Sequence, residues 1–214
     1  MGKNGHKRDS THNEGSAMAD NQHSLATYVS DMLALERHIH IPFEMQSKDE
    51  DFNKYGSARD IVGELVTLSE RHIADLTSAL ARLGGHEAAP VKSAATVLEG
   101  FLAGAIDKMR KTKVSKALRD DYTALALCTA SYTMLTSTAL AMNDAHVASL
   151  AEKHLRDYAR CVMQISDALP DVVVEELQAI GLQVATGTAE QTKRATKNMW
   201  RSSSDSVDST APSR

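Results

Sequence analysis

Ionisable side chains interrupt three of the apolar helical stripes that the sequence predicts. They are Glu36 with His40 at i+4, His72 with Asp75 at i+3, and His154 with Asp157 at i+3. Each pair falls near the middle of its helix, so the pairs can meet at one level of a bundle. A charge buried among helices costs several kcal/mol unless it is paired or bound to a metal. Their co-occurrence indicates either a metal site or a hydrogen-bonded polar layer.

A di-metal centre in a helical bundle needs a Glu from two helices and Glu-x-x-His from the other two. The sequence meets this pattern only in part, because Ser69 stands three residues before His72 and His154-x-x-Asp157 has the reverse order. The segment 122–143 contains no Asp or Glu in twenty-two residues, so the third long helix should offer no acid. The candidate metal ligands are therefore Glu36, His72, His154 and Asp157.

Two interpretations of these residues stay open. Imidazole and carboxylate donors suit Fe, Zn or Mn, and four of them can hold one metal or an incomplete pair. Alternatively, neutral histidines and a paired Glu36 form a structural polar layer with no cofactor. The sequence contains no nucleophile–base pair, no glycine-rich phosphate loop and no Cys-x-x-Cys motif. Enzymatic activity is therefore less expected than a binding role.

Apolar residues at helical spacing predict four long helices over residues 24–46, 57–83, 116–142 and 145–169. A shorter amphipathic segment over 93–109 lies where a ferritin-like bundle has its one long crossover. Pro170 should end the fourth helix, and residues 172–181 should form a short C-terminal helix. The predicted fold is an all-α, up-down four-helix bundle.

Composition is consistent with one helical domain in a chain of 214 residues. Residues 1–22 and 183–214 are polar and should be largely disordered, so the bundle should occupy residues 23–182. The net charge of −4 with mixed signs argues against nucleic acid. No secretory signal or membrane-spanning run is evident, and two cysteines should be free buried thiols in a reducing cytoplasm.

Several short motifs together resemble the YciE/YciF-type ferritin-like proteins, small bacterial bundles linked to stress responses. They are Leu35-Glu36-Arg37, Ile41-Pro42-Phe43-Glu44-Met45, Tyr132-Thr133-Met134-Leu135, Asn143-Asp144 and the run from Leu150 to Asp157. The resemblance implies a cytoplasmic bacterial protein that dimerises. It places ligands at Glu36, His72 and Asp157, while Leu125, Cys128 and Ser131 stand where the family has a glutamate in the third long helix, over residues 116–142.

We therefore expect a stress-associated bundle with an incomplete di-metal site and no robust ferroxidase activity. One alternative is a protein that retains one or two metals (Fe, Zn or Mn) and acts as an oxidase or sequesters metal. Another is a module that binds a small ligand in a cavity where carboxylates once stood, or that serves in assembly. Across these alternatives the expected partner is a second copy of the chain, with no nucleic acid and no membrane.

Overall fold

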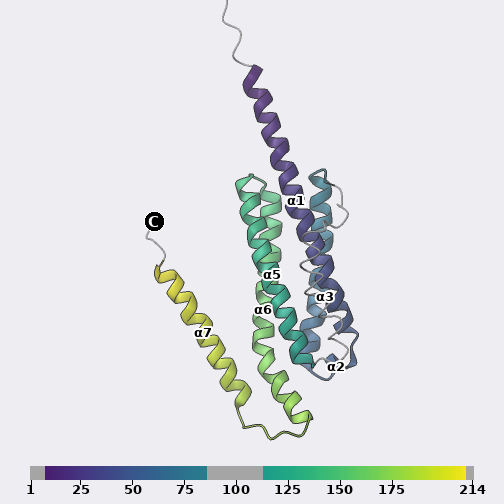
Figure 1. The fold of residues 1–214 in the computed structure, drawn as a ribbon, viewed down its shortest axis with the longest axis vertical. Coiled ribbons are helices and arrows are strands. Elements are labelled where there is room, and N and C mark those ends of the chain that lie inside the picture. Colours follow the sequence, from purple (N-terminus) through teal and green to yellow (C-terminus); the bar gives the residue numbers. More distant parts are fainter. Residues whose placement is uncertain (1–7, 86–112, 211–214) are drawn as a thin grey trace, which may run out of the picture.

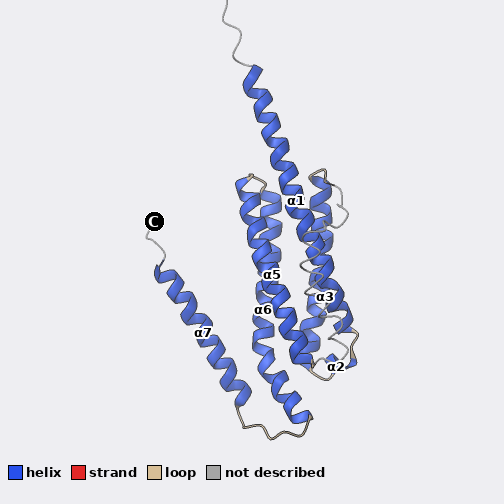
Figure 2. Cartoon of the chain, viewed as in Figure 1, coloured by secondary structure: helices blue, strands red, loops and turns tan. Residues whose placement is uncertain are grey.

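The computed structural model describes residues 8–85 and 113–210, and within them every regular element is a helix (Figure 2). The helices are α1 (Arg8–Ser47), α2 (Glu50–Asn53), α3 (Gly56–Arg82), α5 (Val114–Ala141), α6 (Ala145–Ala179) and α7 (Thr188–Thr210). The expected all-α class is thus confirmed. The predicted amphipathic segment 93–109 lies outside the described residues.

Two antiparallel hairpins, α1 with α3 and α5 with α6, lie side by side and form the bundle (Figure 1). A tight turn joins α5 to α6, where Asn143 adopts a left-handed conformation (φ 58°). Asp144 caps α6 by accepting a hydrogen bond from the backbone N–H of Val147 at 2.9 Å. The same carboxylate binds Arg82 at the end of α3, with Nη2–O distances of 3.0 and 2.7 Å, and so ties the two hairpins together.

The core lies along the axis of the four long helices and consists mainly of Leu, Ala, Ile and Val. Of the residues expected inside, Leu65, Leu68, Leu125, Tyr132 and Ile165 are buried, and Leu150 is partly buried against the core. The largest fully buried side chains are Tyr132, Tyr158 and Phe43. The core also contains many small Ala residues, which let the helices pack closely and leave room for these rings. A few large aromatic side chains are therefore enough to fill the remaining space.

The first helix begins much earlier than expected. Residues 1–22 were predicted to be disordered, but α1 starts at Arg8 and its first part projects beyond the other helices (Figure 1). Extending an existing helix adds one hydrogen bond per residue fixed, whereas starting one is costly. The part of α1 that packs in the bundle supplies the nucleus, so the polar segment continues as helix.

The expectation that Pro170 ends the fourth helix is wrong. The chain remains helical to Ala179, with Pro170 inside α6. Burial of Val172 and Glu176 beyond the proline outweighs its missing hydrogen bond. Glu176 accepts hydrogen bonds from the backbone N–H of Ser115 at 2.9 Å and from its hydroxyl at 2.6 Å. This carboxylate thereby caps the N-terminus of α5, whose own N-cap residue makes no side-chain bond.

Residues 188–210 also form a helix, so the expectation of a largely disordered segment over 183–214 is wrong for this part. Helix α7 follows Gly187, whose positive φ of 80° turns the chain back toward the bundle. Two ion pairs fasten it to α6, from Lys193 to Asp171 at 2.5 Å and from Lys197 to Asp167 at 2.7 Å. The polar composition suggested a loose tail, but helical spacing puts both lysines on one face.

By length and composition alone, one described helix, α5, is apolar enough to cross a membrane. The sequence had predicted no membrane-spanning segment. A core helix of a bundle passes the same test, and α5 packs one face against α6. The opposite face of α5 is exposed and carries no charged residue between Tyr122 and Asn143.

Candidate functional site

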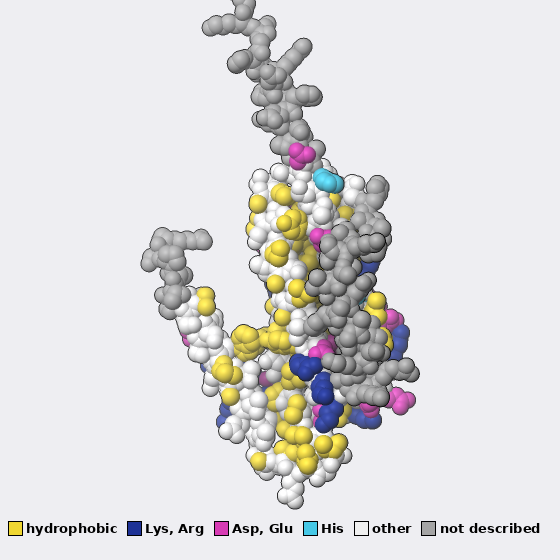
Figure 3. Space-filling model, in the orientation of Figure 1, with side chains coloured by type: hydrophobic (Ala, Val, Ile, Leu, Met, Phe, Trp, Pro, Cys, Tyr) yellow, Lys and Arg dark blue, Asp and Glu magenta, His cyan; other side chains and the backbone are white. Residues whose placement is uncertain are grey.

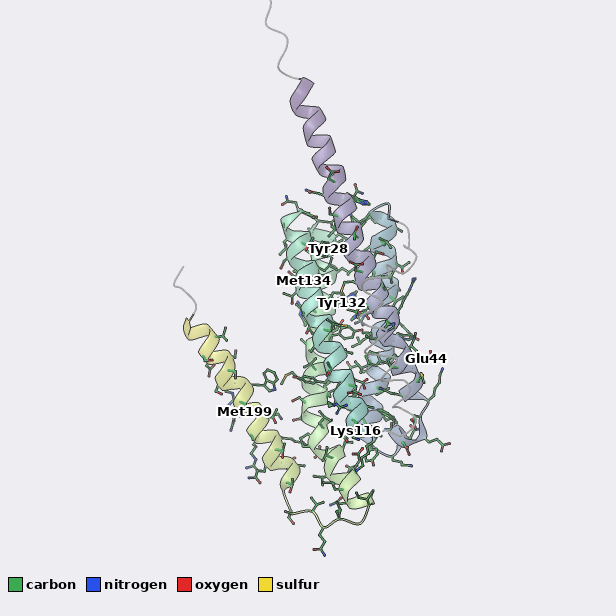
Figure 4. The ribbon with its side chains drawn as sticks, viewed as in Figure 1. Tyr28, Glu44, Lys116, Tyr132, Met134 and Met199 are labelled. Atoms are coloured by element: carbon green, nitrogen blue, oxygen red, sulfur yellow. The ribbon has the colours of Figure 1, made fainter. Side chains whose placement is uncertain are left out.

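A buried polar layer crosses the middle of the bundle. It contains Glu36 from α1, His72 from α3, Tyr132 from α5, and His154 and Tyr158 from α6, and all five are fully buried. Each of the four bundle helices, α1, α3, α5 and α6, therefore contributes at least one member (Figure 4 labels Tyr132 inside the bundle). The layer unites three predicted ligands with two tyrosines.

Glu36 is the centre of the layer, because three groups converge on its carboxylate. The hydroxyls of Tyr132 and Tyr158 donate to Oε1 and Oε2, each at 2.5 Å. His72 Nδ1 lies 3.1 Å from Oε1. Hydrogen bonds to a charged acceptor are about twice as strong as neutral ones, which explains how a carboxylate is accommodated here with no solvent contact.

The two histidines connect this centre to the edge of the bundle. His154 Nδ1 lies 3.0 Å from the hydroxyl oxygen of Tyr132, and its Nε2 lies 3.1 Å from Asp75 Oδ2. His72 Nε2 lies 3.4 Å from Asp157 Oδ2. Each imidazole is therefore paired with the aspartate of the other helix. Together these contacts form one chain of polar groups from Asp75 through the core to Asp157.

A basic side chain supports each of the two aspartates. Arg71 Nη2 donates to Asp157 Oδ2 at 2.5 Å, and Lys153 Nζ donates to Asp75 Oδ2 at 3.2 Å. In sequence the two halves match: Glu70-Arg71-His72-Ile73-Ala74-Asp75 corresponds to Glu152-Lys153-His154-Leu155-Arg156-Asp157. Both His-x-x-Asp spacings were expected to contribute to a site, but the six-residue repeat that contains them was not part of that prediction. It is the signal that could have revealed the crosswise pairing of α3 with α6.

Burial dominates the electrostatics of the layer. Desolvation, followed by the neighbouring His72, lowers the pKa of His154 to about 3, so this ring is neutral near pH 7. Desolvation and the adjacent Glu36 carboxylate raise the pKa of both Tyr132 and Tyr158 well above the usual value. At Asp75, burial raises the pKa, but hydrogen bonds from His154 and Lys153 outweigh it and the net pKa is lowered.

These protonation states leave one proton shared between two bonds. Neutral His154 carries one N–H, and the Asp75 carboxylate next to Nε2 can only accept. With the proton on Nε2, Nδ1 becomes an acceptor and competes with Glu36 for the single hydroxyl proton of Tyr132. Tyr132 therefore shares its proton between Glu36 Oε1 at 2.5 Å and His154 Nδ1 at 3.0 Å, and it is the point at which the chain of hydrogen bonds can shift.

The layer does not fit a metal ion in this arrangement. The rings of His72 and His154 stack, with centroids 3.7 Å apart and an interplanar angle of 18°, so their nitrogens do not converge on a common point. The Glu36 oxygens face protein donors. Among the described residues, no group of three or more His, Cys, Asp or Glu is placed to hold an ion. The structure brings Glu36, His72, His154 and Asp157 together as links in a hydrogen-bonded chain.

Helix α5 does carry a buried acid, contrary to the expectation that it offers none. Asp121 is buried one residue before the acid-free run and accepts a hydrogen bond from Gln46 Nε2 at 2.8 Å. Eleven residues separate it from Tyr132, which is about 16 Å along a helix. Asp121 is therefore too far away to join the layer. Desolvation, only partly offset by Gln46, raises its pKa to about 7.

The remaining candidates lie outside the layer's network. His40 Nδ1 pairs with the hydroxyl of Ser69 at 2.9 Å. Cys128 and Cys161 are free and buried, as the sequence predicted. Desolvation raises the pKa of Cys161 to about 12 and that of Cys128 well above its usual value, so both remain protonated thiols with low reactivity.

Comparisons with known proteins inform the fold only. No family model matches the sequence, and no curated protein matches it. A crystal structure of a protein from Xanthomonas campestris pv. campestris is similar, with a TM-score of 0.62 and 18% sequence identity. The match covers 76% of this chain and 99% of the Xanthomonas chain. At 18% identity the similarity supports a shared helical arrangement and does not indicate an activity.

Proposed function

We propose that this protein is a ferritin-like bundle of the YciE/YciF type, associated with stress responses in the bacterial cytoplasm, that acts by binding and assembly. In this proposal the hydrogen-bonded layer occupies the position of a di-metal centre and has a structural role. The observation that carries it is the set of three side chains on the Glu36 carboxylate: the hydroxyls of Tyr132 and Tyr158 donate to it, and His72 Nδ1 contacts it. A carboxylate satisfied in this way has no unpaired oxygen facing an ion.

Replacing this layer by a metal would require several hydrogen bonds to break together. Glu36 would lose at least one tyrosine donor, and the stacked imidazoles would have to rotate apart. Hydrogen bonds to a charged group contribute about 1.5–3 kcal/mol each, so rearrangement of two or three is expensive. The layer is therefore better suited to fixing the register of the four helices than to exchanging ligands.

Metal analysis of protein purified without a histidine tag tests this proposal. We expect substoichiometric Fe, Zn and Mn, no increase in melting temperature when each metal is added, and no catalysed Fe(II) oxidation. A bound metal would stabilise the folded state by linkage, so a melting shift is a sensitive readout. Glu36→Ala is compared with Glu44→Ala, an exposed acid on the same helix. Iron oxidation that only Glu36→Ala abolishes would favour the residual metalloprotein instead.

The expected self-association has a candidate surface on α5. We propose that the exposed side of α5, which carries Leu127, Met134 and Leu140, pairs with the same side of a second copy (Figure 4 labels Met134). A twofold interface places each patch on itself, so like charges would repel. This part of α5 has no charged residue, which makes it suitable for self-pairing.

Hydroxyl groups on α5 strengthen this assignment because they bond within their own helix. Thr129, Thr133 and Ser137 donate to backbone carbonyls three or four residues earlier, at 2.8–2.9 Å. Their methyl and methylene groups are left to face solvent, so covering them costs little desolvation of polar atoms. Small side chains also permit the close approach of a second helix.

Light scattering after size exclusion measures this self-association. We expect a dimer for the native chain and a monomer for Met134→Glu, which places two like charges at the twofold interface. Met163→Glu is the matched control, since Met163 is an exposed methionine on α6. A dimer that persists in Met134→Glu, or is lost equally in both variants, would reject the α5 face.

A further inference from the structure

A cavity of about 530 Å³ lies between α7 and the bundle, away from the buried polar layer. Its walls come from three helices: Arg119 and Tyr122 of α5, Ser166 and Pro170 of α6, and Met199 and Trp200 of α7. Figure 3 shows hydrophobic side chains gathered where α7 approaches the bundle. Sites for small ligands usually measure about 300–1,000 Å³, so the cavity has the size of a ligand site.

The apolar part of this cavity is aromatic and incompletely covered. Trp200 is 49% exposed and Met199 is 61% exposed, although they belong to the residue types that gain most from burial. Tyr122 and Leu169 form the facing wall. A flat apolar molecule would cover these side chains and stack against the indole.

One cationic group lies at the cavity wall. Arg119 binds its neighbour Asp120 through Nε at 2.9 Å and Nη2 at 2.7 Å, and this pair does not use Nη1. The arginine side chain is 62% exposed, and an exposed pair of this kind contributes little stability. Arg119 can therefore bind an anionic group of a ligand in place of, or together with, Asp120.

The proline inside α6 supplies an acceptor at the same site. Pro170 has no N–H, so the carbonyl of Ser166, four residues earlier, loses its usual helical partner. Both residues line the cavity. A carbonyl without its helical hydrogen bond is suited to accept one from an O–H or N–H of a ligand. This gives Pro170 a role that its position within a continuous helix does not otherwise explain.

Helix α7 is held in position beside the cavity. The ion pairs of Lys193 with Asp171 and of Lys197 with Asp167 fix it along α6. Hydrogen bonds to Asp171 above all, and also to Glu190, raise the pKa of Lys193, so this lysine stays charged at neutral pH. The wall that carries Trp200 is therefore attached to α6 through these ion pairs and can form one side of a site.

We propose that this cavity is a binding site for small aromatic anions, in which the ring system stacks on Trp200, the anionic group pairs with Arg119, and a hydrogen-bond donor faces the Ser166 carbonyl. None of the residues named at this cavity belongs to the buried polar layer. It therefore stands whether that layer is structural or binds a metal.

Two fluorescent probes with the same aromatic skeleton test, in the full-length chain, whether the cavity binds aromatic rings and whether it prefers an anionic group. Anilinonaphthalene sulfonate carries the anion, an amine N–H and fused rings, and phenylnaphthylamine lacks only the sulfonate. The chain has one tryptophan, Trp200, so energy transfer from it to a probe reports binding, and the variants below test whether the probe lies in this cavity. We expect both probes to quench Trp200 emission, with the sulfonate binding about five- to tenfold more tightly, as expected for one charged contact.

Two variants separate the contributions of charge and space. Arg119→Gln should remove the preference for the sulfonate and leave phenylnaphthylamine binding unchanged. Arg59→Gln is the control, because Arg59 binds Asp60 on α3 with the same Nε and Nη2 geometry, at 3.1 and 3.0 Å. Thr196→Phe, at the cavity wall, should fill the cavity and weaken both probes.

Several results would overturn the proposal. They are the absence of energy transfer from Trp200, equal effects of Arg119→Gln on both probes, and unchanged binding in Thr196→Phe. Far-ultraviolet circular dichroism of each variant shows whether it is folded. Met45→Ala, an exposed methionine of α1 outside the cavity and outside the proposed dimer face, separates cavity binding from general adhesion of the probes to apolar surface. A loss of binding in that variant would count against the cavity.

Discussion

Removing the two tyrosine hydroxyls one at a time should have unequal effects on stability. In Tyr158→Phe, Glu36 Oε2 loses the donor that lies 2.5 Å away. Tyr132 both donates to Glu36 Oε1 at 2.5 Å and contacts His154 Nδ1 at 3.0 Å. Tyr132→Phe therefore breaks two contacts, and it leaves the buried His154 nitrogen without a partner.

Magnitudes follow from the number and type of bonds. A hydrogen bond to a charged group contributes about 1.5–3 kcal/mol, so Tyr158→Phe should lower the free energy of unfolding by about 2 kcal/mol. An unpaired buried nitrogen costs a further 1–3 kcal/mol or so, which brings Tyr132→Phe to about 4 kcal/mol. Urea unfolding followed by circular dichroism measures both, with an unchanged m-value showing that the denatured state is unaffected.

Tyr28→Phe is the matched control for this experiment. Tyr28 is a partly exposed tyrosine on α1, so its hydroxyl should contribute less than about 0.5 kcal/mol. Equal costs for Tyr132→Phe and Tyr158→Phe would show that the contact between Tyr132 and His154 contributes nothing. A cost near zero for both would refute the claim that these hydroxyls stabilise a buried carboxylate.

Three further predictions concern other parts of the bundle. Asp121, whose pKa is raised from 3.8 to about 7, favours the folded state when protonated, so its contribution to stability is lost as pH rises from about 4 to 7. The free energy of unfolding of Asp121→Asn should therefore rise relative to that of the native chain as pH increases over this range, by up to about 4 kcal/mol at 1.36 kcal/mol per pH unit. Urea unfolding of both proteins at several pH values measures this difference, and a difference that does not change with pH would contradict the prediction. Glu176→Ala should cost about 1–3 kcal/mol by leaving Ser115 at the start of α5 uncapped, with the exposed Glu175→Ala as the thermal-melt control. Lys193→Gln should release α7 from Asp171 and shift Trp200 emission to longer wavelength, and an unchanged spectrum would show that this ion pair does not hold α7.

Sequence periodicity determined the helical elements and the residues that face inward. The spacing of apolar residues along each helix fixes one face, and a polar residue on that face must enter the core. This is how Glu36, His72 and His154 were predicted to meet at one level, and all three are fully buried there. Local chemistry also placed the turn at Asn143-Asp144, where a left-handed residue precedes a helix cap.

Tertiary packing decided what the buried groups bind. Spacing along a helix puts His72 near Asp75 and His154 near Asp157, but the rotation of α3 against α6 pairs each histidine with the other helix's aspartate. Packing also brought Tyr132 to Glu36. Such distances depend on the height and rotation of all four helices together, which no single segment encodes.

The helix boundaries show the same division. Glycine, proline and polar residues predicted where helices should end, and at Pro170 and near both termini the prediction failed. Burial of Val172 and Glu176 carries α6 past Pro170, and ion pairs to α6 hold α7 in place. A proline within a helix costs about 3 kcal/mol, and the burial of Val172 and Glu176, which is gained only after the chain has folded, exceeds that cost. The sequence by itself therefore specified a four-helix core with a polar centre, and the packed structure decided its partners and its limits.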